Sequence, residues 1–135
     1  MSPIPAPQLP RPRRSSQQRR RALRHGMWAE WLAAFSLLCK GYHLLAYRYA
    51  GHGGEIDLVM RRKQVIAFVE VKYRAGHDQA LTAIDAGKQS RFNKAVNLWL
   101  MRNGWAQDHV LRGDAVLVVP WHWPRHIEDA FTLAE

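Results

Sequence analysis

The chain has 135 residues, a net charge of +9 and one cysteine, Cys39. This length suits one domain, and a hydrophobic content of 47% is sufficient for a core. A single cysteine excludes an internal disulfide, and no apolar run approaches the ~20 residues of a membrane helix. We therefore expect a cytoplasmic protein with no membrane span and no secretion signal.

The positive charge is concentrated in the N-terminal segment. Residues 1–25 contain seven arginines and no acid, whereas the rest of the chain contains 13 basic and 11 acidic residues, a net charge of +2. Residues 1–21 are rich in Pro, Arg, Ser and Gln, which predicts a disordered tail before an ordered domain at residues 22–135. Three interpretations of this tail stay open: an arm that binds nucleic acid, a segment that contacts an anionic membrane, and a solvated extension without a partner.

Periodicity predicts the elements of the domain in chain order. Apolar residues recur every three or four positions from Ala22 to Lys40, which indicates a helix. Strands rich in Val, Ile, Leu and Tyr are then expected at residues 42–49, 54–60 and 65–72, followed by a helix at 82–102 and strands at 110–119 and 127–133. This order predicts an α/β fold with a mixed β-sheet flanked by helices.

Two acids and a lysine lie within the second and third predicted strands. A hairpin loop of residues 61–64 would place Asp57 opposite Phe68. In that register Asp57, Glu70 and Lys72 share one face of the sheet, and the two carboxylates are diagonal neighbours about 7 Å apart. A register change of one residue would turn Asp57 to the other face.

This set of side chains is suited to hydrolysis of a phosphodiester bond. Carboxylate oxygens bind Mg²⁺ or Mn²⁺, with water completing the coordination shell. The cation lowers the pKa of a bound water, and a neighbouring lysine orients that water and stabilises developing charge. The alternative is a solvated sheet face on which Lys72 pairs with Glu70. The occurrence of all three polar groups between apolar residues favours the metal site.

Two motifs in these strands resemble those of the YraN family, bacterial proteins classed as predicted endonucleases: Gly-Glu-Ile-Asp-Leu at residues 54–58 and Val-Glu-Val-Lys at residues 69–72. Members of this family resemble PD-(D/E)XK nucleases, whose restriction-endonuclease-like fold includes archaeal Holliday-junction resolvases. The resemblance spans residues 26–135 and implies that Asp57 and Glu70 are metal ligands and Lys72 the catalytic lysine. It implies DNA, including structured or branched DNA, as the substrate. Because such resolvases act as dimers, a homodimer is an open expectation.

The resemblance also assigns roles outside the two motifs. On periodicity alone, Glu30 either faces solvent or leans over the site, and solvent is favoured. The resemblance makes Glu30 a ligand of the metal or its water, and gives Gln89 a role in orienting water or phosphate. Arg48 matches a basic position of the family before the first motif, and the resemblance makes it a candidate contact to nucleic acid. A second Arg common in the family is Ala50 here, which weakens the case for a phosphate clamp.

Basic residues recur every third position of the second predicted helix, at Lys88, Arg91 and Lys94. They form either an ordinary solvated face or, with Arg74, contacts to the phosphate backbone. The favoured prediction is a nuclease that acts on DNA with Mg²⁺ or Mn²⁺. The alternatives are a catalytically weak nucleic-acid-binding module of the same fold that acts with a partner protein, and an RNA- or ribosome-associated factor recruited by the tail.

Overall fold

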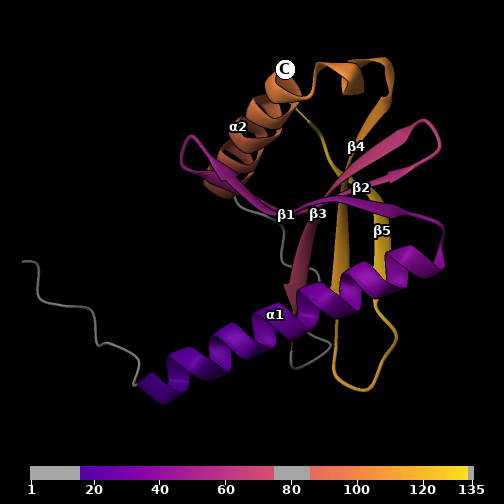
Figure 1. The fold of residues 1–135 in the computed structure, drawn as a ribbon. Coiled ribbons are helices and arrows are strands. Elements are labelled where there is room, and N and C mark those ends of the chain that lie inside the picture. Colours follow the sequence, from indigo (N-terminus) through magenta and orange to yellow (C-terminus); the bar gives the residue numbers. More distant parts are fainter. Residues whose placement is uncertain (1–15, 75–85, 134–135) are drawn as a thin grey trace, which may run out of the picture.

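A computed structural model describes residues 16–74 and 86–133. Two α-helices surround one five-stranded sheet whose strands lie in the order β1-β2-β3-β4-β5 (Figure 1). The predicted α/β fold with a mixed sheet and flanking helices is confirmed. The elements are α1 (Ser16–Cys39), β1 (His43–Gly51), β2 (Gly54–Arg62), β3 (Val65–Tyr73), α2 (Ala86–Arg102), the 3-10 helix η2 (Gly104–Asp108), β4 (Val110–Val118) and β5 (Arg125–Phe131).

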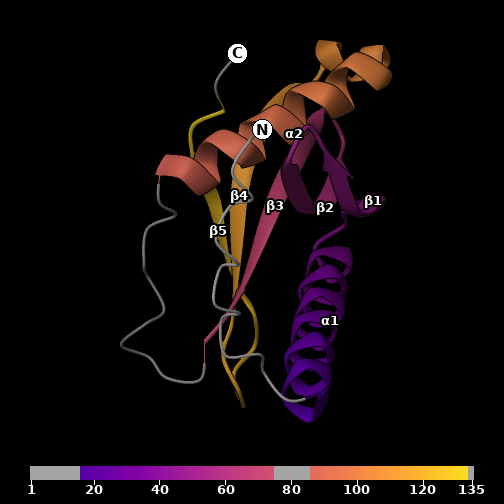
Figure 2. The ribbon, with the colours of Figure 1, turned by 90° about the vertical axis from the view of Figure 1, so that its left-hand side faces the viewer.

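The helices lie on opposite faces of the sheet, and each covers its own apolar cluster (Figure 2). Leu37 of α1 belongs to a cluster with Leu58, whereas Phe92 of α2 belongs to a cluster with Val59 and Phe68. Leu58 and Val59 are adjacent in β2 and point to opposite faces because successive side chains of a strand alternate. The largely apolar sequence of the central strands is explained by burial on both faces.

Strands β1, β2 and β3 form an antiparallel meander, and β4 returns parallel to β3. A parallel neighbour requires a crossover connection, which here contains α2. The edge strand β5 pairs antiparallel with β4 and packs its last residue over Gly113. A Cβ at Gly113 would lie 2.7 Å from the ring of Phe131, which itself packs against Phe92 at a centroid distance of 4.7 Å. The absent side chain at Gly113 thus lets β5 approach α2.

The β2–β3 hairpin is tighter than the sequence suggested. Arg62 pairs with Val65, so the loop contains two residues rather than the four predicted at residues 61–64. Lys63 has a φ of 55°, a left-handed conformation found in two-residue hairpin turns. Strand β2 therefore extends two residues further than expected, to Arg62, whereas β3 begins at Val65 as predicted.

The tighter turn changes the register by two residues. Phe68 pairs with Val59, and not with Asp57 as predicted. The last pair of the observed register is Leu58 with Val69. The next position in this register sets Asp57 directly beside Glu70, and not diagonally from it as predicted. Since side chains alternate with a period of two, a shift of two residues leaves Asp57 on the predicted face.

The boundaries of the helices differ from those predicted. Helix α1 begins at Ser16, ahead of the expected start at Ala22. Residues 1–15 of the predicted tail and residues 82–85 of the second predicted helix lie outside the described residues. Neither helix of the described segments is both long and apolar enough to cross a membrane.

The turn between β1 and β2 lies directly against α2. A Cβ at Gly54 would be 1.8 Å from the carbonyl oxygen of Arg91, and one at Gly51 would be 2.1 Å from the side chain of Leu98. Only glycine allows this approach. It brings the start of β2, and with it Asp57, to the N-terminal half of α2.

We expect Gly54→Ala to destabilise the protein because the new methyl group would meet the backbone of α2, which cannot move aside like a flexible side chain. The expected loss in the free energy of unfolding is about 1–3 kcal/mol, measured by urea denaturation. Gly104→Ala is the matched control, since a Cβ there has no atom within 4 Å. Equal stabilities for both variants would contradict the close approach.

Candidate active site

Asp57 lies where β2 and β3 separate. The pairing of the two backbones ends at Leu58 and Val69. Beyond this point Oδ2 of Asp57 accepts a hydrogen bond of 2.7 Å from the backbone N–H of Val71. The carboxylate thereby accepts a hydrogen bond from a backbone N–H of β3 that no longer has a backbone partner in β2. This bond fixes the position of Asp57 relative to the next strand.

We call the place where β2 and β3 separate, beyond Leu58 and Val69, the fork. Glu70 of β3 is the neighbour of Asp57 across it. Its side chain is buried, and its negative charge is felt by Asp57. On its other side, Nζ of Lys88 lies 2.5 Å from Oε1 of Glu70. Lys88 is about half exposed, whereas Glu70 is almost fully enclosed. The predicted convergence of the two acids is therefore present, with a lysine from α2 beside them.

The environment of Asp57 favours its protonated form. Burial raises the pKa of Asp57 to about 8, and the charges of Glu70 and Glu30 act in the same direction. The hydrogen bond from Val71 opposes this shift but does not cancel it. In the absence of a cation, the Asp57 carboxyl is therefore mostly protonated at neutral pH.

Two adjoining hollows reach the carboxylate pair. One, of about 560 Å³, lies between the β1–β2 turn and α2 and includes Arg91 in its lining. The other, of about 410 Å³, lies beside α1 and includes Glu30. Asp57, Glu70 and Lys88 line both hollows. These volumes are in the range of small-molecule sites, and the pair is accessible from the sides of both helices.

Glu30 does not face solvent, the alternative that periodicity favoured. It is 6% exposed and lines the hollow beside α1. Arg48 binds it with Nη2 at 2.7 Å and Nε at 2.8 Å, and the hydroxyl of Tyr47 donates to it at 3.3 Å. Arg48, expected to contact nucleic acid, is thus engaged by a buried carboxylate, and this contact raises its pKa.

Lys72 and Gln89 lie at the margin of this arrangement. Lys72 follows Glu70 by two residues on β3 and is 9% exposed, but neither hollow includes it among its described lining residues. Nε2 of Gln89 donates to the carbonyl of Thr132 at 3.1 Å and so holds α2 to the segment after β5. The catalytic roles assigned to both residues stay predictions.

The predicted basic stripe of α2 is exposed. Lys88 and Arg91 line the hollow at the carboxylate pair, and Lys94 lies one turn further along the helix. Arg74 follows the end of β3, where its backbone N–H donates to Val118 and its guanidinium donates to the carbonyl of Tyr73. Lys88 and Arg91 therefore lie at the site, whereas Lys94 and Arg74 are not among the described residues that line either hollow.

Glu55 is a site residue that the sequence reasoning omitted. It is exposed and lines both hollows. The signal was available, because Glu55 precedes Asp57 by two residues, the spacing that puts two side chains on one face of a strand. Among the described residues, however, no three His, Cys, Asp or Glu side chains are close enough together to hold a metal ion.

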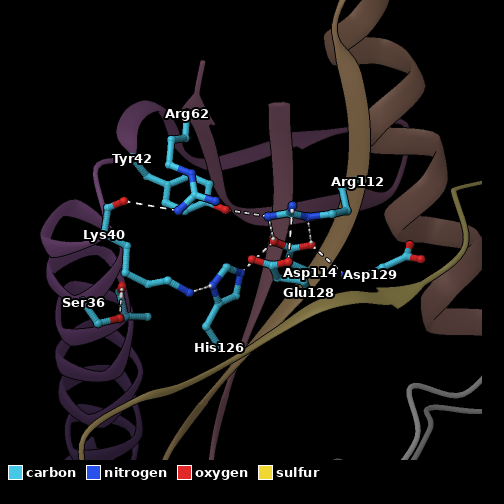
Figure 3. A network of polar contacts seen from close by, with 10 residues as sticks. Ser36, Lys40, Tyr42, Arg62, Arg112, Asp114, His126, Glu128 and Asp129 are labelled. Atoms are coloured by element: carbon cyan, nitrogen blue, oxygen red, sulfur yellow. Dashed lines mark hydrogen bonds and ion pairs between the residues drawn. The ribbon is translucent and has the colours of Figure 1, made fainter. Parts of the chain in front are cut away.

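A second polar cluster, centred on Asp114 of β4, lies beside the C-terminal end of α1 (Figure 3). Fully buried Asp114 accepts hydrogen bonds from Arg112, from His126 at 2.7 Å and from the backbone N–H of Asp129. Burial acts to raise the pKa of Asp114, but the bonds from His126 and Arg112 outweigh it and lower that pKa. Arg112 also donates to the hydroxyl of Tyr42. These mutual contacts indicate a structural role for the Arg112–Asp114 pair.

Comparison with known proteins relates this chain to bacterial relatives. A UPF0102 protein of Methylobacterium radiotolerans is 48% identical over 118 residues, which cover 87% of this chain and 92% of the relative. A UPF0102 protein of Methylorubrum extorquens is 51% identical over 124 residues, covering 91% and 97%. One from Sinorhizobium medicae is 45% identical over 118 residues, covering 87% and 97%.

A family model also matches residues 29–118, a span that begins beside Glu30 and includes the carboxylate pair and all of β4. The match of the family model and the identity to these relatives both extend over most of the chain. The chain belongs to the uncharacterised protein family UPF0102, the YraN family.

Proposed function

We propose that this protein is a cytoplasmic nuclease that hydrolyses phosphodiester bonds of DNA with the help of Mg²⁺ or Mn²⁺. The observation that carries the proposal is the pair of partly buried Asp57 and buried Glu70, which lines a hollow together with Lys88 and Arg91. Two adjacent carboxylates repel each other when both are charged, and a cation relieves that repulsion. The surrounding positive charges suit a substrate with phosphate groups.

The donor atoms at the fork fit a hard divalent cation. Asp57 and Glu70 would hold the ion, and Glu30, enclosed in the adjoining hollow, would act through a water molecule. Mg²⁺ usually retains several waters and needs only one or two carboxylates, so a pair of acids is a sufficient protein contribution. When bound, the ion supplies charge neutralisation and a water of lowered pKa.

The remaining side chains act on the substrate. Lys88 and Arg91 line the hollow and would contact the phosphate there. Arg74 and Lys94 would contact phosphates further along the DNA backbone. Such contacts position DNA without reading its sequence, which suits recognition of structured or branched DNA by shape. Lys72, beside Glu70 on β3, would stabilise the charge that develops on the phosphate, and Gln89 would assist in orienting water.

One contact favours a second candidate function, a nucleic-acid-binding module of the same fold with little activity. The ammonium group of Lys88 already neutralises Glu70 at 2.5 Å. A lysine in this position can replace a cation electrostatically, and the protein would then bind nucleic acid with a partner protein and cleave slowly. The two functions differ in whether binding is followed by cleavage.

For a nuclease, Asp57→Asn should reduce cleavage of branched or duplex DNA in Mg²⁺ by about 10²-fold or more, because the pair loses one anionic ligand. Lys72→Ala should reduce cleavage to a similar degree if its amine stabilises the transition state. Gel assays of end-labelled DNA, run with fluorescence anisotropy for binding, measure both steps. Lys63→Ala is the matched lysine control, since Lys63 is exposed in the β2–β3 turn and should leave cleavage unchanged.

The same assays separate the alternatives. Equal cleavage by the wild type and by Asp57→Asn would identify a contaminating nuclease and reject the proposal. Tight binding by the wild type without cleavage in either Mg²⁺ or Mn²⁺ would favour the binding module.

The raised pKa of Asp57 predicts a dependence of stability on pH. Without divalent cations, folded Asp57 retains a proton up to about pH 8, whereas an unfolded aspartate releases it near 3.8. The folded state binds more protons between these values, so this residue's contribution to stability is complete below pH 3.8 and is lost as the pH rises to about 8. Asp57→Asn lacks this loss and should be more stable than the wild type at pH 8 by about 1–3 kcal/mol, measured by urea denaturation in chelator.

Divalent cations should reverse this order. At 100-fold excess over its dissociation constant, Mg²⁺ would stabilise the wild type by about 2.7 kcal/mol and leave Asp57→Asn nearly unaffected. Asp108→Asn, which alters an exposed carboxylate of η2, is the control and should follow the wild type. Identical responses of Asp57→Asn and the wild type to pH and to Mg²⁺ would show that no ion binds at the pair.

A further inference from the structure

The outer face of α1 is an apolar seam. Trp28, Trp31, Phe35 and Leu38 are 48%, 59%, 54% and 49% exposed, although each is a large apolar side chain. The inner face of the same helix is also apolar and is buried against the sheet. A helix that is apolar on both faces is characteristic of one that is covered on both faces. Within the described part of the chain, residues 16–74 and 86–133, only the inner face of α1 is covered.

The spacing of the seam indicates what covers it. The four residues follow one another at intervals of three, four and three, which is the a/d pattern of a helix that meets another helix. An a/d stripe is narrower than the apolar face of a helix lying on a sheet, and it brings knobs from each helix into holes of the other. This pattern favours a partner helix over a flat surface.

Three side chains of the seam already pack against other aromatic residues of the same chain. Trp28 packs edge-on against Tyr73 at a centroid distance of 6.1 Å, and Trp31 packs against Tyr47 at 5.6 Å. Phe35 contacts Trp123, which is itself 62% exposed and widens the apolar surface. Side chains that are already ordered lose little conformational entropy on association.

The size and charge of this surface suit a second copy of the chain. From the exposed fractions and about 150–250 Å² for each aromatic side chain, the seam with Met27 and Trp123 offers roughly 700 Å² per copy. Each partner of a stable interface contributes about 800 Å². The exposed residues 27–38 include no charge, and the one acid, Glu30, is buried against Arg48. A nucleic-acid surface would require interleaved cations, which this part of the face lacks.

We propose that two copies of this protein associate through their α1 helices, with Trp28, Trp31, Phe35 and Leu38 of each copy packed against the same residues of the other. A two-fold axis makes one patch complementary to itself, so the dimer is closed and does not grow into a filament. Glu30 is buried and held by Arg48, so it is not one of the exposed residues that form the interface.

The test is sedimentation equilibrium of the full chain across a dilution series, without metal or nucleic acid. The wild type should have twice the 15.6 kDa mass of the chain, and high salt should not dissociate it, as expected for apolar contacts. The double variant Trp31→Glu/Phe35→Glu should be a folded monomer by sedimentation and circular dichroism. Met101→Glu is the matched control, because Met101 is 77% exposed on α2 and lies outside the seam.

If the double variant fails to fold, Leu38→Glu alone, at the end of the seam, should weaken dimerisation at least 10-fold. A monomeric wild type at every concentration would overturn the proposal, as would a dimer that survives in both seam variants. Dissociation by Met101→Glu, or loss of the dimer in high salt, would also overturn it. So would quenching of tryptophan fluorescence by single-stranded DNA in a monomer, which would identify the seam as a base-stacking surface.

Discussion

The hydrogen bond from the Val71 N–H to the carboxylate of Asp57 is the contact on which the candidate site depends. It forms where the backbones of β2 and β3 part, and it brings the acid of one strand beside Glu70 of the other. The cost of this arrangement is electrostatic, because burial and the charge of Glu70 raise the pKa of Asp57 to about 8. Strongly shifted pKa values of this kind are concentrated at functional sites of proteins. The fork is therefore more informative about function than any other polar feature of the described chain.

The space around the fork arises from two close approaches. Gly54 lets the β1–β2 turn touch the backbone of α2, which brings Lys88 and Arg91 to the carboxylates. On the other side, α1 contributes Glu30, held by Arg48. The two helices cover opposite faces of the sheet, yet both reach the place where the strands diverge. A continuous sheet would separate these two sides, and the divergence of β2 from β3 joins them.

The Asp114 cluster shows how a different polar arrangement behaves. Asp114 is fully buried, whereas Asp57 is partly buried. The neighbours of Asp114 are Arg112 and His126. Burial acts to raise the pKa of Asp114, but the hydrogen bonds that these neighbours donate outweigh burial and lower its pKa. Its contacts tie β4 to β5 and to the end of α1 (Figure 3). Positive neighbours stabilise a buried acid as a charged structural element, whereas acidic neighbours favour its protonated form. A cation that binds such an acid displaces the proton and relieves the repulsion between the carboxylates. This contrast supports a functional role for Asp57 and a structural one for Asp114.

By itself, the sequence determined the element order, the mixed sheet and the face shared by Asp57 and Glu70, because periodicity and strand alternation are local properties. It misjudged the hairpin register by two residues, since the turn conformation at Lys63 has no strong local signal. Periodicity also favoured solvent for Glu30, and only the structure encloses it, through contacts with Tyr47 and Arg48 of β1. Whether a helix face is covered, how near α2 lies to Gly54 and how charge alters the pKa of Asp57 were decided by tertiary structure, because each depends on residues distant in the chain.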